Sequence, residues 1–344
     1  MKKSFITMMM LAFAYNAFAD KLSIAPFTIS VGETKQIAIQ MTMTEKEYRA
    51  VQFDLYLPEG VTIAKKKNGK EDWSLNADRI EGHSISGNLK EGGYYTIAIV
   101  SLSEDTFYEE EGDLMYIKVV ASDQLSTGNT QGYLKNVNLA VSSTESTLPA
   151  DEPFTCTGSL STTVTTLGYA SFSWPKALDF TNSGLTAYIA TTCNGSSLHL
   201  EPVTKVPANT GLILKGLAGT ENTYSLETTE ETTDDVSSNL LSSNTAGEYT
   251  VASDDIYVLS NLDDGRPGFY LASQGIHVAK YKSYLQYPAV ACRGLSFDEG
   301  TTTGIINHSS AATADAHYYD LQGRRADNPS SGIYVKAGKK LVVK

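Results

Sequence analysis

Hydrophobic and polar residues alternate strictly over much of the first half of the chain. In VQFDLYLPEGVTI, residues 51–63, every second residue is apolar up to the turn at Pro58-Glu59-Gly60. Alternate residues of an extended strand point to opposite sides, so this pattern predicts a strand with one buried face and one face toward solvent. The residues expected on the buried face are Val51, Phe53, Leu55 and Leu57.

The same alternation recurs in three further segments: TKQIAIQMTM at 34–43, GGYYTIAIVSL at 92–102 and GDLMYIKVVA at 112–121. Short turn signals rich in Gly separate them, and no long helical period appears. This arrangement predicts an all-β fold built as a β-sandwich. The further residues expected in its core are Ile37, Ile39, Met41, Met43, Tyr95, Ile97, Ile99, Met115, Ile117 and Val119.

Composition divides the chain into two β domains and a small C-terminal part. The stretch 142–160, SSTESTLPADEPFTCTGSL, is rich in Ser, Thr and Pro, as linkers are. In the second β region, Asn194-Gly195 predicts a hairpin, and 221–247 is expected to be a long surface loop. The expected parts are a first β-sandwich at 20–144, a linker at 145–160, a second all-β domain at 161–299, a second linker at 300–316 and a C-terminal β segment at 317–344.

The first nineteen residues have the features of a secretory signal peptide. Lys2 and Lys3 are followed by an apolar stretch from Phe5 to Ala14 and then by Ala17-Phe18-Ala19, in which Ala17 and Ala19 form an A-x-A cleavage site. The apolar stretch is too short to span a bilayer, and no later stretch is long enough. We therefore expect an exported protein, at the cell surface or extracellular, with no transmembrane span.

Charge and cysteine content narrow the range of partners. A net charge of -12 and a pI near 4.9 exclude a nucleic-acid binder, because contacts to phosphates require clustered Lys and Arg. The three cysteines, Cys156, Cys193 and Cys292, allow at most one internal disulfide. Cys193 and Cys292 are the expected pair because they share a predicted domain, and buried thiols are the alternative.

Searches for catalytic chemistry find no convincing set of residues. GHSISG at 82–87 departs from the G-x-S-x-G nucleophile motif, and HExxH is absent, so we predict neither an enzyme nor a bound cofactor. Asp263 and Asp264 in NLDDGRPG could hold a structural calcium ion, or could simply form a turn. A sugar-binding platform would need exposed aromatic rings, and the candidates are Tyr94, Tyr95, Tyr281, Tyr284 and Tyr287.

The order of motifs between residues 22 and 143 resembles the cohesin domain, which belongs with carbohydrate-binding jelly-roll sandwiches. The resemblance is carried by AVQFDLYLPEGVTI, by YYTIAIVSLSEDTFYEEEGDLMYIKVVAS with its start at Gly112-Asp113-Leu114, and by GYLKNVNLAVSS. It implies a non-catalytic module that binds a protein partner, dockerin-like in cohesins, through one sheet face.

The C-terminal residues resemble the sorting domain found at the end of secreted proteins of Bacteroidetes. YYDLQGRRADNPSSGIYVKAGKKLVVK carries a Y-D-x-x-G-R motif, then G-I-Y, then a final strand rich in Lys and Val. This resemblance implies delivery to the cell surface, whereas the alternative is an ordinary terminal hairpin. The residues that fit the motif are Tyr319, Asp320, Gly323, Arg324, Gly332, Tyr334, Lys340 and Lys344.

These features together predict an exported, non-catalytic binding or adhesion protein whose first domain docks a partner protein. The alternative is a carbohydrate-binding surface protein that captures extracellular polysaccharide. A docking module would use a flat sheet face, whereas a sugar binder would present a row of exposed aromatic rings.

The signal-peptide assignment predicts that the mature chain begins at Asp20. Edman sequencing of the protein recovered from the cell envelope or the medium should read Asp-Lys-Leu-Ser. Recovery of a chain that still carries Met1 would contradict the assignment.

Overall fold

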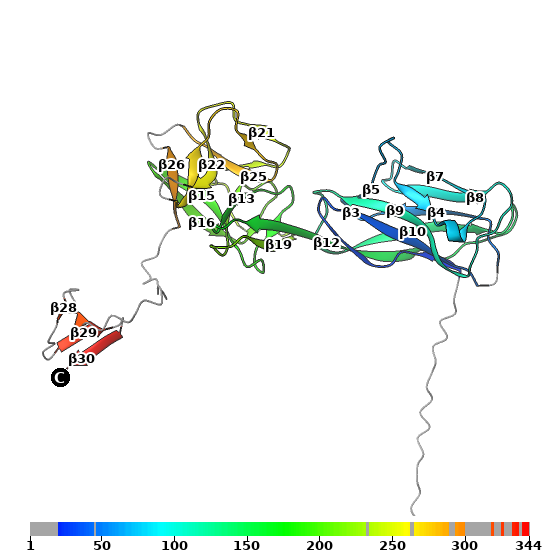
Figure 1. Ribbon diagram of the computed structural model, residues 1–344, viewed down its shortest axis with the longest axis horizontal. Coiled ribbons are helices and arrows are strands. Elements are labelled where there is room, and N and C mark those ends of the chain that lie inside the picture. The colour runs from blue at the N-terminus through cyan, green and yellow to red at the C-terminus, as the bar shows by residue number, and fades with distance from the viewer. Residues whose placement is uncertain are drawn as a thin grey trace, which may run out of the picture. The chain divides into compact units, whose positions relative to one another are not determined.

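The alternating segments of the first domain form two facing sheets in the computed structural model (Figure 1). The structure describes residues 20–44, 46–231, 234–261, 265–288 and 293–299, and the backbone of four strands after residue 317. One sheet of the first domain consists of β1 (Lys21–Ser23), β3 (Thr34–Thr42), β9 (Glu111–Ala121), β5 (Val61–Ile63) and β6 (Trp73–Leu75).

The facing sheet continues beyond the first domain. Its strand order is β17-β14-β19-β12-β10-β4-β8-β7, with β11 beside β10 and β2 beside β12. The strands are β2 (Phe27–Ser30), β4 (Ala50–Tyr56), β7 (His83–Leu89), β8 (Tyr95–Ser101), β10 (Gly128–Ala140), β11 (Ser146–Thr147), β12 (Glu152–Val164), β14 (Leu178–Asp179), β17 (Lys205–Val206) and β19 (Asn222–Thr228). A single 3-10 turn, η1 (Ala77–Arg79), lies among them in the described part of the first domain.

The predicted alternation of buried and exposed residues is confirmed. Val51, Phe53 and Leu55 of β4 are at most 1% exposed and pack in one core with the apolar faces of β3, β8 and β9. Leu57, also expected on this face, is partly buried at the edge of the same core. The all-β prediction therefore holds because period-two patterning buries one face of each strand.

The expected linker at 145–160 is wrong, since most of it is strand β12. Phe154 and Cys156 lie in the core of the first sandwich, and β12 pairs with β10 over seven register positions from Gly128↔Gly158 to Leu134↔Glu152. The first sandwich thus extends past residue 144. The Ser- and Thr-rich composition concealed an alternation that is present in the sequence, with Phe154, Cys156, Gly158 and Leu160 two residues apart.

A glycine on β10 makes room for this strand. A Cβ atom at Gly132 would lie 2.1 Å from Cζ of Phe154, so only glycine lets the ring cross its register partner. The same ring stacks on Phe27 of β2, with 6.2 Å between centroids. β12 therefore anchors β2 and β10 to one core.

The second domain is also built of strands, as predicted. Its larger sheet has the order β13-β18-β15-β16-β26-β23-β22-β25-β20, and β21 pairs with β24. The strands are β13 (Tyr169–Phe172), β15 (Thr186–Asn194), β16 (Ser197–Val203), β18 (Leu212–Lys215), β20 (Leu241–Asn244), β21 (Tyr249–Thr250), β22 (Ile256–Asn261), β23 (Pro267–Leu271), β24 (His277–Val278), β25 (Lys282–Gln286) and β26 (Gly294–Asp298).

The hairpin predicted in this domain is present, whereas the predicted long loop is not. The hairpin at Asn194-Gly195 is confirmed, since β15 and β16 pair with Asn194 opposite Ser197 and Gly195 has φ +61°. The expected long loop at 221–247 is wrong, because it contains β19 and β20. In β19 every second residue is exposed, namely Thr223, Ser225 and Glu227, and Leu226 between the last two is buried.

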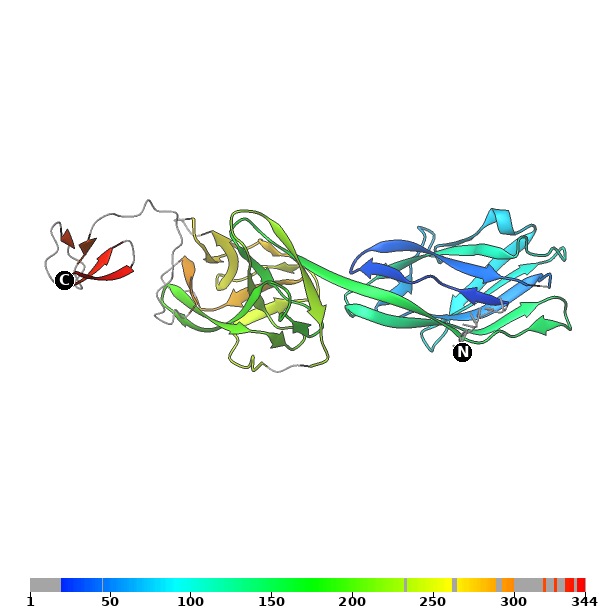
Figure 2. The ribbon, with the colours of Figure 1, turned by 90° about the horizontal axis from the view of Figure 1, so that it is seen from below.

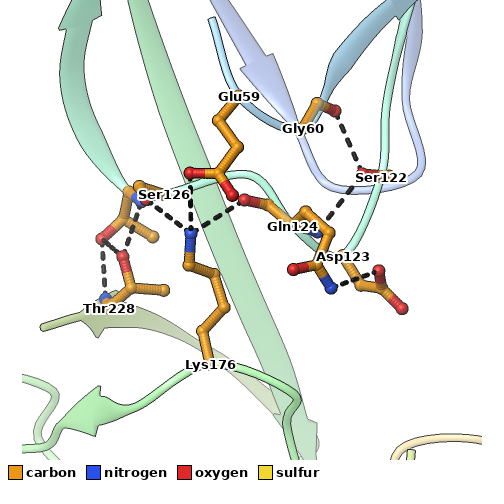
Figure 3. A network of polar contacts seen from close by, with 9 residues as sticks. Glu59, Gly60, Ser122, Asp123, Gln124, Ser126, Lys176 and Thr228 are labelled. Carbon is orange, nitrogen blue, oxygen red and sulfur yellow. Dashed lines mark hydrogen bonds and ion pairs between the residues drawn. The ribbon is translucent and has the colours of Figure 1, made fainter. Parts of the chain in front are cut away.

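The continuous strand β12 joins the two domains, and a polar network beside it ties them together (Figure 1, Figure 2). Lys176 Nζ donates to Gln124 O and to Ser126 Oγ, both at 2.9 Å, as Figure 3 shows. Thr127 and Thr228 exchange hydrogen bonds, because each backbone N–H donates to the other's hydroxyl, at 2.9 and 2.8 Å. The turn at 122–127 of the first sandwich is thereby fixed to the second domain.

The C-terminal segment forms a separate unit after residue 300, with a four-stranded sheet in the order β28-β27-β29-β30. The strands are β27 (Tyr318–Tyr319), β28 (Arg325–Ala326), β29 (Gly332–Lys336) and β30 (Lys339–Val343). The expected linker at 300–316 lies outside the described residues. In the part of the chain that is described, no helix reaches the length and apolarity needed to cross a membrane.

The position of β12 predicts where the first domain can be cut. A fragment of residues 20–145 should lack fixed tertiary structure, because β2 loses its partner strand and Phe154 leaves a gap against Gly132. A fragment of residues 20–160 should fold. Near-ultraviolet circular dichroism and urea denaturation of both fragments test this, and a cooperative transition in the shorter one would contradict it.

Candidate functional site

The outer face of the sheet β10-β4-β8-β7 is the most regular exposed surface of the first domain. The residues of these strands that point away from the core stand opposite one another in rows across the sheet. Since each strand buries its alternate residues, this face is set by the same pattern that fills the core. The rows are Ser84, Val100, Ala50 and Ala140, then Ser86, Ala98, Gln52 and Asn138, then Asn88, Thr96, Asp54 and Lys135.

Small side chains make much of this face flat. In the middle row Ala98 lies between Ser86 and Gln52, and in the row at one end Ala50 and Ala140 are register partners. Side chains of this size leave the backbone of the strands close to the surface. The face therefore offers a level area to another molecule.

Three tyrosines and a lysine form one end of the face. The rings of Tyr56 and Tyr94 are stacked, with 4.6 Å between centroids and 16° between planes. Lys135 Nζ lies 5.1 Å from the ring centroid of Tyr56 and 4.8 Å from that of Tyr133, within cation–π range. Desolvation, together with the neighbouring Tyr94 and Asp54, raises the pKa of Tyr56. We call these four residues the tyrosine–lysine cluster.

Asp54 braces the strands beneath this cluster. Its carboxylate accepts hydrogen bonds from the Thr96 hydroxyl on β8 at 2.7 Å and from Asn136 Nδ2 on β10 at 2.8 Å. Asn136 has φ +50° and lies in a bulge where the register of β10 against β4 shifts between Lys135 and Asn138. Bulges redirect neighbouring side chains, and here the carboxylate fixes the bulge in place.

The acidic loop 104–113 lies over an unusual buried group that the sequence did not reveal. Arg79 is 0% exposed, and its Nη2 donates to the carbonyl oxygen of Glu109 at 3.2 Å. Nε and Nη1 have no hydrogen-bond partner among the described residues. Burial lowers the pKa of this guanidinium, and the nearby Glu109 and Asp113 oppose the shift. The cation holds the loop from below, and no local motif around Arg79 distinguishes it from a surface arginine.

The residues predicted for export and sorting remain predictions. Ala17 and Ala19 lie outside the described residues, as do Asp320, Gly323, Arg324 and Lys344. The other four sorting-motif residues fall in strands of the C-terminal sheet, with Tyr319 in β27, Gly332 and Tyr334 in β29 and Lys340 in β30. Register pairs Gly332 with Val343 and Val335 with Lys340.

The candidates for catalysis and metal binding do not form a site among the described residues. Ser84 lies in strand β7, where its hydroxyl donates to Val100 O at 3.4 Å, so GHSISG is a strand rather than a nucleophile turn. No group of acidic, His or Cys side chains in the described ranges could hold a metal ion. The calcium candidates Asp263 and Asp264 are outside these ranges, as is Cys292, so its pairing with Cys193 stays a prediction.

The five tyrosines proposed as a sugar platform do not share one surface. Tyr95 is only 4% exposed and belongs to the core. Tyr281 lies against Trp174 and donates to Asp123 at 2.8 Å, at the junction between the domains. Tyr284 stacks on Tyr249 in the second domain, where Tyr287 is partly buried. Of the five, only Tyr94 lies on the flat face. Its partners Tyr56 and Tyr133 are not among the predicted residues, because Tyr is an ordinary strand residue and the sequence does not distinguish them.

No family model matches the chain, and no curated protein matches its sequence. The solved structures that resemble it include the seventh ScaB type I cohesin from Pseudobacteroides cellulosolvens, with 13% identity, 40% of this chain and 90% of that chain covered, and a TM-score of 0.32. A non-cellulosomal cohesin from Archaeoglobus fulgidus has 13% identity, the same coverage and a TM-score of 0.31. A type I cohesin–dockerin complex from Clostridium thermocellum has 8% identity, 40% and 98% coverage and a TM-score of 0.33. Likeness at this level assigns neither a partner nor an activity.

The brace at Asp54 predicts a measurable contribution to stability. Asp54→Ala should lower the free energy of unfolding of the full chain by about 1–2 kcal/mol, because Thr96 and Asn136 lose their acceptor. Gln52→Ala, on the same strand and exposed, should change it by less than about 0.5 kcal/mol. Urea denaturation monitored by circular dichroism compares the two variants. Equal midpoints would show that the hydrogen bonds of Asp54 do not stabilise the fold.

Proposed function

We propose that this chain is an exported, non-catalytic binding protein whose first sandwich docks a partner protein on the outer face of β10-β4-β8-β7. The observation that carries the proposal is the form of that face, which is flat in the middle and bears the tyrosine–lysine cluster at one end. Flat sheet faces with aromatic anchors at one side suit protein partners better than small ligands, which require concave sites.

The cluster favours a protein over a polysaccharide. Sugar rings bind by lying on a free aromatic face, but Tyr56 and Tyr94 cover one face of each other and Lys135 occupies the space over Tyr56. A sugar could reach the remaining face of Tyr56 only by displacing the lysine. A protein partner can instead contact the exposed edges of the rings and the phenol hydroxyls, which Tyr side chains commonly provide at interfaces.

The resemblance of residues 22–143 to cohesins suggests which partner to test first. Cohesins bind dockerins, and a solved structure similar to this chain is a cohesin–dockerin complex. A dockerin-like module is therefore the first candidate partner. The acidic loop 104–113 would act mainly on the rate of association, because exposed charges steer encounter more than they add affinity.

Export and surface location belong to the same proposal. Cleavage after Ala19 would free Asp20, whose carboxylate accepts from the backbone N–H of Thr44 at 2.7 Å and from the Tyr48 hydroxyl at 2.6 Å. These bonds fix the start of the sandwich immediately after the proposed cleavage site. The C-terminal β unit would then serve as the sorting segment that delivers the two domains to the surface.

The docking proposal predicts that a charge placed in the flat middle weakens binding. The mature chain is used as bait against extracellular proteins of the same organism, retained partners are identified and purified, and affinity is measured by calorimetry. Ala98→Arg should weaken binding by roughly tenfold or more, because a long charged side chain holds the surfaces apart. Thr62→Arg, exposed on the opposite sheet, is the matched control and should leave affinity unchanged.

A glycan array with the same protein separates the two binding classes. Retention of glycans together with the absence of any protein partner would overturn the docking proposal in favour of polysaccharide capture. A protein partner whose affinity is equal for Ala98→Arg and Thr62→Arg would place the interface elsewhere.

A further inference from the structure

A cavity of about 380 Å³ opens on the second domain, away from the docking face. It lies among the end of β12, strand β13, strand β22, the segment 276–279 and the start of β25. This volume is within the range of small-molecule sites, about 300–1,000 Å³. The apolar residues that line it are Leu167, Ala170, Val258, Leu259, Ile276 and Val278.

The wall of this cavity suits an apolar ligand. Ile276 is 46% exposed, and Val258 is only partly buried. A ligand that covered Ile276 and Val258 would remove apolar surface from water, at about 25 cal/mol for each Å². Binding of a ligand with a hydrocarbon part is therefore favourable at this surface.

Lys282 is the only lysine or arginine of the lining, which also contains His277. Its backbone is held on both sides, since its N–H donates to Ala279 O at 3.3 Å and its carbonyl accepts from the Ser173 hydroxyl at 3.1 Å. Within the described ranges, no carboxylate or other acceptor pairs with Nζ. Neighbouring lysines differ, because Lys280 Nζ lies 2.9 Å from Asp123 and Lys215 pairs with Glu299.

The Lys282 ammonium has no counterion among the described residues. Burial lowers the pKa of the Lys282 ammonium, and no nearby acid opposes that shift. A half-buried ammonium without a counterion is costly, and an anion beside it would stabilise the charged form. The cavity thus favours a ligand that has one negative charge beside Lys282 and apolar groups elsewhere.

We propose that this cavity binds a small apolar molecule that carries one carboxylate, with the carboxylate on Lys282 Nζ and the hydrocarbon part against Ile276 and Val258. A single flexible ammonium is a point charge and suits a monoanion. Phosphate groups would call for several donors or the planar fork of arginine, and no arginine lines the cavity. Ser171 and Ser260 belong to the same lining.

The test uses decanoate and decanol, which share a hydrocarbon chain and differ in charge. Calorimetric titration of the mature chain should show saturable binding of decanoate below its micelle concentration, and decanol should bind at least roughly tenfold more weakly. Lys282→Met keeps the length and the apolar stem of the side chain, so it should abolish this preference. Lys67→Met, at an exposed turn of the first domain, removes the same charge and should leave decanoate binding unchanged.

A second variant tests the apolar wall. Val258→Trp fills the cavity and should block both ligands, with near-ultraviolet circular dichroism confirming that each variant is folded. The proposal is overturned if decanoate shows no saturable binding, if the wild-type chain binds decanol as tightly as decanoate, or if Lys282→Met retains the preference. The comparison of decanoate with decanol uses the wild-type chain, so it tests the proposal even if Lys282→Met fails to fold.

Discussion

Strand β12 is the element on which both the first and the second β domain depend. Its first part completes the core of the first sandwich with Phe154 and Cys156, and its last part pairs with β19 of the second domain from Leu160 to Val164. Neither core is closed without it. The two domains are consequently parts of one hydrogen-bonded sheet, and the polar contacts of Lys176 and Thr228 reinforce a connection that the backbone already makes.

The candidate docking face follows from the same strand. β10 lies between β12 and β4. It pairs with β12 up to Leu134 and with β4 at Lys135, so the bulge at Asn136 begins directly after a stretch of β10 that is paired on both sides. Asp54 adds a side-chain bond to each neighbour of β4 at the same level. A flat surface on a twisted sheet needs such support, because β-strands joined only by backbone bonds can shift and twist relative to one another.

How much of this the sequence reveals depends on the range of the interactions. Strand positions and core residues such as Phe53 and Ile39 are predictable, because their alternation is local. β12 was missed because Ser and Thr composition outweighed a weaker alternation that starts at Phe154. The tyrosine–lysine cluster and the buried Arg79 could not be predicted, since each depends on register between strands distant in the sequence. Lys282 has no local signal either, because its lack of a partner is a property of the packed domain.

The shared strand also determines how the protein would respond to mechanical load. A pull that separates the two domains along β12 acts parallel to the strand, and its hydrogen bonds to β10 and β19 run across that direction. Bonds loaded in shear resist together, whereas bonds at the end of a hairpin open one after another. The connection between the two domains would therefore be among the parts of the described chain most resistant to extension.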